Sequence, residues 1–116
     1  MTAQLMRTWV AVCRFDDLLP ERGVAALVEG EQVAVFRTFD GMLHAIGNRD
    51  PFSGAFVLSR GIVGSSGEVP TVASPLYKQV FDLRTGHCLS DPAVSVPVHE
   101  VRRVDGAVEV RLCPPS

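Results

Sequence analysis

Cysteine is scarce in this sequence. Its three cysteines, Cys13, Cys88 and Cys113, are odd in number and far apart in the chain. This pattern argues against the disulfide framework of a small secreted domain, and each thiol is expected to be a small core side chain or a surface thiol. The first seven residues also lack the apolar segment of a secretion signal. We therefore expect a cytoplasmic protein.

Long apolar runs and an excess of one charge are absent as well. The longest apolar stretches are far shorter than the ~20 residues that a membrane span needs. The chain has 11 basic and 13 acidic residues, which gives a formal net charge of −2. A nucleic-acid-binding domain would need a clustered basic face. We expect this chain to contact neither a membrane nor a nucleic acid.

The length and composition of the chain favour one compact unit. It has 116 residues, of which 47% are hydrophobic. A chain of this length can bury roughly two-thirds of the surface that its unfolded form exposes, which is enough for one core without disulfides or metal. We expect a single domain spanning residues 1–116, with frayed tails at residues 1–6 and 113–116.

Short apolar stretches separated by turn residues predict an all-β fold. Asp-Gly pairs at residues 40–41 and 105–106 each divide two apolar runs, and this dipeptide is among the strongest short hairpin signals. No convincing 3.6-residue apolar period is present, although residues 15–20 could form one helical turn. Residues 47–75 are expected to be mostly loop. Antiparallel strands are expected at residues 8–13, 23–28, 32–37, 42–46, 62–63, 69–73, 80–83, 98–104 and 107–112.

Two loop sequences resemble the cluster-binding loops of Rieske iron–sulfur domains. Residues 50–55 read Asp-Pro-Phe-Ser-Gly-Ala, where the first Rieske loop reads Cys-Pro-His-x-Gly-Ala. Residues 74–86 read Ser-Pro-Leu-Tyr-Lys-Gln-Val-Phe-Asp-Leu-Arg-Thr-Gly, where the second typically reads Cys-Pro-x-His-Gly-x-x-Phe-Asp-x-x-Thr-Gly. The resemblance covers nearly the whole chain. It implies a Rieske-like fold of short antiparallel strands, arranged as stacked sheets or a small barrel, with both loops at one end.

All four cluster-ligand positions of this pattern are changed. Asp50 and Ser74 stand at the cysteine positions, and Phe52 and Tyr77 stand at the histidine positions. A Rieske [2Fe–2S] centre needs two thiolates on one iron and two imidazoles on the other. A phenyl ring has no donor atom, and the Ser and Tyr hydroxyls are protonated, hard oxygen ligands at neutral pH. The cluster site is degenerate, and we expect neither a metal nor another cofactor in this chain.

Together with residues 58–64, the two loops look like those of the small subunit of NAD(P)H-dependent assimilatory nitrite reductase. In that family the Rieske-like fold is retained without its cluster. The large subunit carries FAD, an iron–sulfur cluster and sirohaem, and reduces nitrite to ammonium. The resemblance implies a non-catalytic accessory subunit that docks on the large subunit and supports it. The alternatives are a Rieske-type [2Fe–2S] ferredoxin or oxygenase component, and a free-standing β-domain that binds another protein.

No motif in the sequence predicts independent catalysis or another metal site. A Gly-rich phosphate loop between a strand and a helix is absent, and so is a Gly-x-Ser-x-Gly nucleophile motif. His87 and Cys88 are adjacent, so on a strand their side chains would point to opposite faces. His44 and His99 have no partner at ligand spacing in the sequence.

Phe52, Leu76 and Tyr77 are the candidate functional residues, because they stand where the cluster ligands and their neighbours would meet. In one interpretation Phe52 and Tyr77 fill the vacated volume by apolar packing and a hydrogen bond from the Tyr hydroxyl. In the other, the loops present an aromatic anchor to the large subunit. Arg60 and Arg84 also lie in family-like segments, where each could form a salt bridge within the fold or contact a partner.

Overall fold

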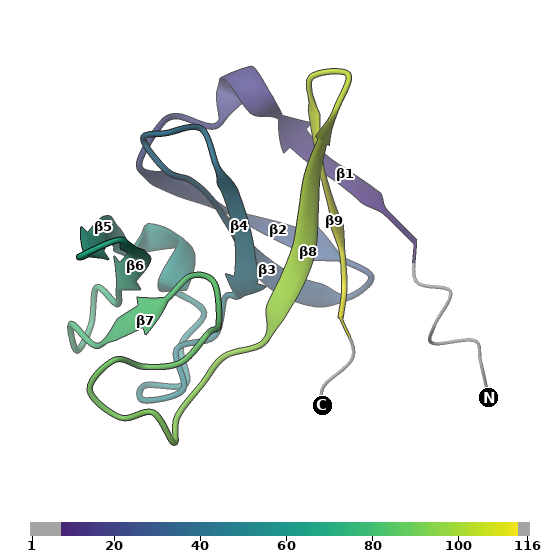
Figure 1. Ribbon diagram of the computed structural model, residues 1–116. Coiled ribbons are helices and arrows are strands. Elements are labelled where there is room, and N and C mark those ends of the chain that lie inside the picture. The colour runs from purple at the N-terminus through teal and green to yellow at the C-terminus, as the bar shows by residue number, and fades with distance from the viewer. Residues whose placement is uncertain (1–7, 114–116) are drawn as a thin grey trace.

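The chain forms two antiparallel sheets (Figure 1). The computed structural model describes residues 8–113, so the tail expected at residues 1–6 and all but the first residue of the tail expected at 113–116 lie outside the described residues. The strands of the six-stranded sheet, ordered β1-β9-β8-β4-β3-β2, are β1 (Val10–Arg14), β2 (Arg22–Val28), β3 (Glu31–Arg37), β4 (Leu43–Gly47), β8 (Val98–Val104) and β9 (Ala107–Arg111). The three-stranded sheet, ordered β5-β6-β7, consists of β5 (Ile62–Ser66), β6 (Val69–Ala73) and β7 (Val80–Asp82). The predicted all-β fold is confirmed.

The hairpin of β8 and β9 shows why these segments become strands. Val108 and Val110 are fully buried and alternate with charged residues on β9. On the other face, Arg102 on β8 lies 2.7 Å from Glu109, and Arg111 lies 2.6 Å from Glu100. The alternation places the apolar side chains in the core, and the charged ones pair across the two strands.

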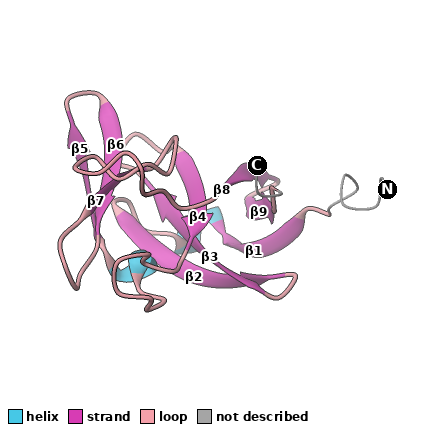
Figure 2. Cartoon of the chain, turned by 90° about the horizontal axis from the view of Figure 1, so that it is seen from below, coloured by secondary structure: helices cyan, strands magenta, loops and turns pink. Residues whose placement is uncertain are grey.

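The six-stranded sheet curls so that its edge strands β1 and β2 contact each other. Figure 2 shows the three-stranded sheet on one side of the molecule, with the turn between β2 and β3 on the opposite side. Within residues 8–113, no helix is long and apolar enough to cross a membrane. Cys113, which the sequence assigns to a tail, lies inside the described part, and its backbone N–H donates a hydrogen bond to His99 Nδ1 at 3.1 Å.

Strand β3 separates two hydrophobic cores. Its side chains alternate, so Val33 and Val35 face the interior of the curled sheet while Ala34 and Phe36 face the three-stranded sheet. All four are fully buried. The inner face of the three-stranded sheet completes the second core with Val72 on β6 and other side chains. Because both faces of β3 are covered, its central residues form a continuous apolar run.

The connection from β4 to β5 contains one element that the sequence does not predict. Residues 58–60 form a single 3₁₀ turn, and its first residue, Leu58, is fully buried in the core between the two sheets. Strand β5 also runs three residues beyond the expected 62–63, to Ser66. The helical turn predicted within residues 15–20 is present as a 3₁₀ turn at Phe15–Asp17.

Candidate functional site

Two loops that resemble the Rieske cluster loops meet at one end of the three-stranded sheet. The first spans residues 48–57 between β4 and the 3₁₀ turn, and the second spans residues 74–79 between β6 and β7. They are joined by a hydrogen bond from the Ser74 hydroxyl to Asp50 Oδ2, with the two oxygens 2.5 Å apart. Both residues are fully buried. The two former cysteine positions therefore hold the loops together directly.

Asp50 also organises the first loop around itself. Its Oδ1 accepts a hydrogen bond from the backbone N–H of Phe52 at 2.9 Å. Its own backbone N–H donates to the carbonyl of Ala55 at 2.8 Å, and its carbonyl accepts from the N–H of Gly54 at 2.7 Å. Gly54 takes a positive φ of 78°, which a glycine adopts without steric penalty. Both carboxylate oxygens of Asp50 are satisfied, so its burial is supported by hydrogen bonds.

Ser74 plays the corresponding part in the second loop. Its backbone N–H donates to the carbonyl of Gln79 at 2.9 Å, and its carbonyl accepts from the N–H of Lys78 at 3.0 Å. Lys78 stands where the Rieske pattern has glycine, and it takes a φ of 62° in the left-handed region. A non-glycine residue in that region costs roughly 1–2 kcal/mol. The loop thus holds Lys78 in a conformation that a glycine adopts without strain and a lysine does not.

The two former histidine positions point to different surroundings. The Phe52 ring packs beside Phe81, with ring centroids 6.2 Å apart, and 37% of the residue remains exposed. Tyr77 is 61% exposed and Leu76 is 51% exposed. The interpretation in which Phe52 and Tyr77 together fill the vacated volume is therefore wrong for Tyr77. Only Phe52 lies partly against the core.

The end of the molecule where the two loops meet is called the tip. Its residues do not fit a [2Fe–2S] cluster. The Asp50 carboxylate and the Ser74 hydroxyl are committed to each other, and the other two positions offer a phenyl ring and an exposed phenol. A Rieske cluster takes two thiolates and two imidazoles. Among residues 8–113, no three His, Cys, Asp or Glu side chains gather at metal-binding distance.

Asp82 and Arg84, toward the end of the three-stranded sheet opposite to the second loop, serve the fold. Arg84 donates from its backbone N–H to Asp82 Oδ1 at 2.7 Å, and its guanidinium lies 3.5 Å from the same oxygen. Burial raises the pKa of the Asp82 carboxyl, but the hydrogen bonds and charge of Arg84 outweigh it and leave the pKa below its ordinary value. Arg84 therefore makes the intramolecular salt bridge that the sequence left as one of two possibilities.

The Cys88 thiol also has a structural role. Its thiol is buried and lies 3.7 Å from Gln79 Oε1 and 3.4 Å from the Ser90 hydroxyl. The Ser90 hydroxyl donates to the same Gln79 oxygen at 2.9 Å. These contacts fasten the end of the second loop to the segment after β7. His87 is exposed on that segment, and its Nδ1 lies 3.1 Å from the carbonyl oxygen of Pro92.

Sequence reasoning missed the bond between Asp50 and Ser74. It treated both residues as lost ligands, although the sequence contained a usable signal. The two cysteine positions carry one acidic side chain and one hydroxyl donor, which are complementary hydrogen-bonding groups. A paired replacement of this kind indicates that the two positions still touch.

The comparison with known families agrees with the geometry. A family model described as a Rieske-like [2Fe-2S] domain matches residues 8–111. The fold, the two loops and this match define a Rieske-like domain whose loops carry none of the four cluster ligands.

Two relatives cover nearly the whole chain. The nitrite reductase (NADH) small subunit of Escherichia coli (strain K12) is 46% identical over 107 residues, which is 91% of this chain and 99% of the relative. A crystal structure described as an NADH-dependent nitrite reductase small subunit from Mycobacterium tuberculosis is 49% identical, with a TM-score of 0.90 over 95% of this chain and 99% of that chain. The chain belongs to the family of NADH nitrite reductase small subunits.

Two further matches place this domain in other settings. The nitrite reductase [NAD(P)H] large subunit of Klebsiella oxytoca is 38% identical over 104 residues, which is 90% of this chain but only 11% of that relative. The ferredoxin of carbazole 1,9a-dioxygenase from Nocardioides aromaticivorans has a TM-score of 0.76 at 31% identity, over 89% of this chain and 96% of that chain. The same domain thus occurs within a longer polypeptide and in a ferredoxin.

Proposed function

We propose that this chain is the cluster-free accessory subunit of a cytoplasmic NAD(P)H-dependent nitrite reductase. The observation that carries the proposal is the 46% identity to the Escherichia coli small subunit, which the chain matches over 99% of that relative's length. The chain acts as one domain that docks on a large subunit. That large subunit holds FAD, an iron–sulfur cluster and sirohaem, and it reduces nitrite to ammonium.

The Klebsiella oxytoca relative supports a physical association with the large subunit. In that protein, a segment related to nearly the whole of this chain is part of a polypeptide named the large subunit. Covalent linkage keeps two binding partners at a high effective concentration without any strong contact. A separate chain of the same type has to supply its own docking surface.

The exposed tip is the docking surface that we propose. Phe52, Leu76 and Tyr77 expose 37%, 51% and 61% of their surface, respectively. The hydrogen bonds around Asp50 and Ser74 fix both loops before a partner arrives, so little conformational entropy is lost on binding. Aromatic side chains on a rigid support are typical anchors at the centre of an interface.

Lys78 adds a charge to this surface. Its side chain is exposed next to Tyr77, and its backbone takes the left-handed conformation that glycine would adopt without strain. The lysine is therefore kept at a conformational cost. A charge beside an aromatic anchor adds electrostatic specificity to a contact.

The chemistry of the tip supports an accessory role over that of an electron carrier. The rival function is a Rieske-type [2Fe–2S] ferredoxin, to which the fold is similar. An electron carrier of that type needs the four cluster ligands. Here two of the four positions are consumed by the bond between Asp50 and Ser74. We propose that electrons pass to nitrite through the cofactors of the large subunit alone.

An association measurement tests the proposal. The chain and its own large subunit are purified separately, and their Kd is measured by isothermal titration. Tyr77→Ala is expected to weaken binding about tenfold or more, as loss of a central aromatic anchor does. The matched control is Leu27→Ala, because Leu27 is 69% exposed on β2 of the six-stranded sheet and belongs to neither loop. Absence of a complex between the unmodified proteins would contradict the proposed function.

A further inference from the structure

The outer face of the three-stranded sheet carries an apolar row whose two end residues are exposed. Ile62 on β5 is directly opposite Ala73 on β6, and Ala73 is directly opposite Val80 on β7. Residues directly opposite each other on antiparallel strands share one face of the sheet. The backbone N–H of Leu89 donates to the carbonyl of Val80 at 2.8 Å, which extends the row by one residue. These four residues, Ile62, Ala73, Val80 and Leu89, form the outer row.

The two ends of the outer row are exposed and its middle residues, Ala73 and Val80, are half-buried, whereas the opposite face of the same sheet packs into the core. Ile62 is 66% exposed and Leu89 is 43% exposed. On the inner face the corresponding pairs are Val63 with Val72 and Val72 with Phe81, which pack into the core between the sheets. A sheet covered on one face alone normally places polar side chains on the other. An apolar row across the open face is therefore a feature that the fold does not require.

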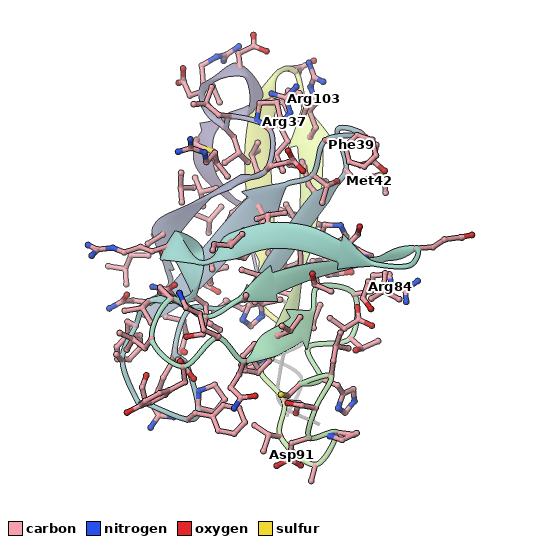
Figure 3. The ribbon with its side chains drawn as sticks, turned by 90° about the vertical axis from the view of Figure 1, so that its left-hand side faces the viewer. Arg37, Phe39, Met42, Arg84, Asp91 and Arg103 are labelled. Carbon is pink, nitrogen blue, oxygen red and sulfur yellow. The ribbon has the colours of Figure 1, made fainter. Side chains whose placement is uncertain are left out.

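Small residues beside the outer row leave a shallow groove of about 560 Å³. Gly64 and Ser65 belong to its floor on β5, and a Cβ placed on Gly64 would approach only the Thr71 side chain, at 3.8 Å. Lys78 and Gln79 of the second loop line the same groove. The groove is therefore continuous with the tip. Figure 3 shows this face of the three-stranded sheet toward the viewer, with Asp91 on the loop beyond it.

We infer that the outer row is the second half of the docking surface for the large subunit. This inference rests on the proposed function. A stable interface buries about 800 Å² on each partner. The four residues of the tip are partly exposed, and an aromatic side chain buries about 150–250 Å² when fully covered, which is an upper limit for Leu76 and Lys78. At about half exposure, these four and Phe56 of the first loop, which is 51% exposed, supply at most roughly 600 Å². The interface therefore continues onto neighbouring surface.

The outer row is the neighbouring surface that fits this requirement. The groove beside it is lined by Lys78 of the tip and has room for side chains of a partner, and the row itself has no charged member. The occupant is an apolar surface of the same large subunit, since one rigid partner seated on the tip would extend over the adjoining face.

Charge substitutions in the outer row test the inference. Ile62→Glu and Leu89→Glu are made singly and together in the full chain, and the Kd for the large subunit is measured beside Tyr77→Ala. The control is Leu27→Glu, because Leu27 at 69% exposure matches Ile62 at 66% and lies on the other sheet. The double variant is expected to bind at least tenfold more weakly, and each single variant about threefold to tenfold more weakly. The control stays within twofold, and circular dichroism verifies that each variant is folded.

Each alternative outcome has a distinct meaning. If Tyr77→Ala weakens binding while both row variants stay within twofold, the interface ends at the tip and the inference is wrong, although the proposed function stands. If the unmodified chain does not bind the large subunit, the proposed function itself fails. Sedimentation of the chain alone tests whether the outer row binds a second copy of the chain instead. If the chain forms a dimer and Ile62→Glu dissociates it, the outer row belongs to that dimer, and this too would overturn the inference.

Discussion

Asp50 and Ser74 perform with one hydrogen bond the structural task that a metal cluster performs in a ligand-bearing Rieske domain. They sit on two different loops, 24 residues apart in the sequence, and both are fully buried. A buried carboxylate is tolerated only when its oxygens are hydrogen-bonded. The Ser74 hydroxyl and the Phe52 N–H meet that requirement. The pair connects the loops without iron.

Replacement of Ser74 tests this connection at the level of one atom. Ser74→Ala removes the hydroxyl that donates to Asp50 Oδ2, so this oxygen of the buried carboxylate loses its hydrogen bond. We expect the free energy of unfolding to fall by about 1–3 kcal/mol, the cost of an unsatisfied buried polar group. The measurement is urea unfolding followed by circular dichroism.

A serine elsewhere in the chain provides the control for this substitution. Ser66 is exposed at the end of β5, and Ser66→Ala should change the free energy of unfolding by less than about 0.5 kcal/mol. Equal stability of the Ser74→Ala variant and the unmodified chain would show that the loops are held together by other contacts.

At the residue scale, the sequence predicts what the site has lost but not how it is arranged. The residue types at positions 50, 52, 74 and 77 are enough to exclude a Rieske cluster. The outward direction of Tyr77 could not be predicted, because it depends on the backbone of the loop. The next residue, Lys78, takes a φ of 62°, which no propensity assigns to lysine.

At the scale of single elements, two glycines with a positive φ allow the cost of backbone strain to be separated from the cost of a steric clash. Gly86, in the turn after β7, has a φ of 81°, and Gly30, between β2 and β3, has a φ of 86°. A Cβ on Gly86 would lie 2.1 Å from the Val96 carbonyl oxygen, whereas a Cβ on Gly30 would meet nothing within 4 Å. Only the first position combines backbone strain with a clash.

We expect Gly30→Ala to lower the free energy of unfolding by about 1–2 kcal/mol, the cost of the left-handed conformation alone. Gly86→Ala should lower the free energy of unfolding by more than about 3 kcal/mol, because the turn after β7 has to move away from Val96 as well. Guanidinium unfolding of the two variants measures the difference. Equal losses would mean that the turn after β7 yields easily and that its contact with Val96 contributes little to stability.

Elements with strong local signals are predictable here, and elements formed by tertiary packing are not. The hairpin of β8 and β9 follows from an Asp-Gly turn and clean alternation, and its predicted first strand has the observed bounds, Val98–Val104. The second half of β5, through Ser65 and Ser66, has no apolar signal and is a strand because it pairs with β6. The 3₁₀ turn at Leu58–Arg60 likewise depends on burial of Leu58.

At the scale of the whole molecule, the two cores were beyond sequence reasoning. Residues 33–36 are all fully buried on β3, and a continuous apolar run of this length is compatible with a strand covered on both faces or with a buried helix segment. Only the packing of the second sheet against β3 decides between them. The resemblance to Rieske domains supplied the fold that periodicity alone could not.

His44 links the stability of the whole fold to pH. It lies half-buried on β4, and burial lowers its pKa below the ordinary value of 6.5, although Asp40 and Asp82 act to raise it and Arg84 acts to lower it. The unfolded chain therefore takes up a proton at a higher pH than the folded chain does. The folded state loses stability as pH falls from about 6.5 toward the lower pKa of the folded state.

We expect the free energy of unfolding to fall between pH 7.5 and pH 5.5, and His44→Gln to reduce that fall. The measurement is urea unfolding across this pH range. The slope of the unmodified chain, measured in the same series, is the reference. An unchanged slope in the His44→Gln variant would show that other groups cause the pH dependence.

The proposal that this chain assists a large subunit without carrying electrons is tested most directly by nitrite turnover. NADH-dependent and NADPH-dependent nitrite consumption by the cognate large subunit is measured with and without an excess of this chain, whose iron content is determined in the same preparation. The account predicts a higher rate or a longer lifetime of activity upon addition of the iron-free chain. Turnover that is unchanged by the iron-free chain, or that rises only with a chain that holds iron, would contradict it.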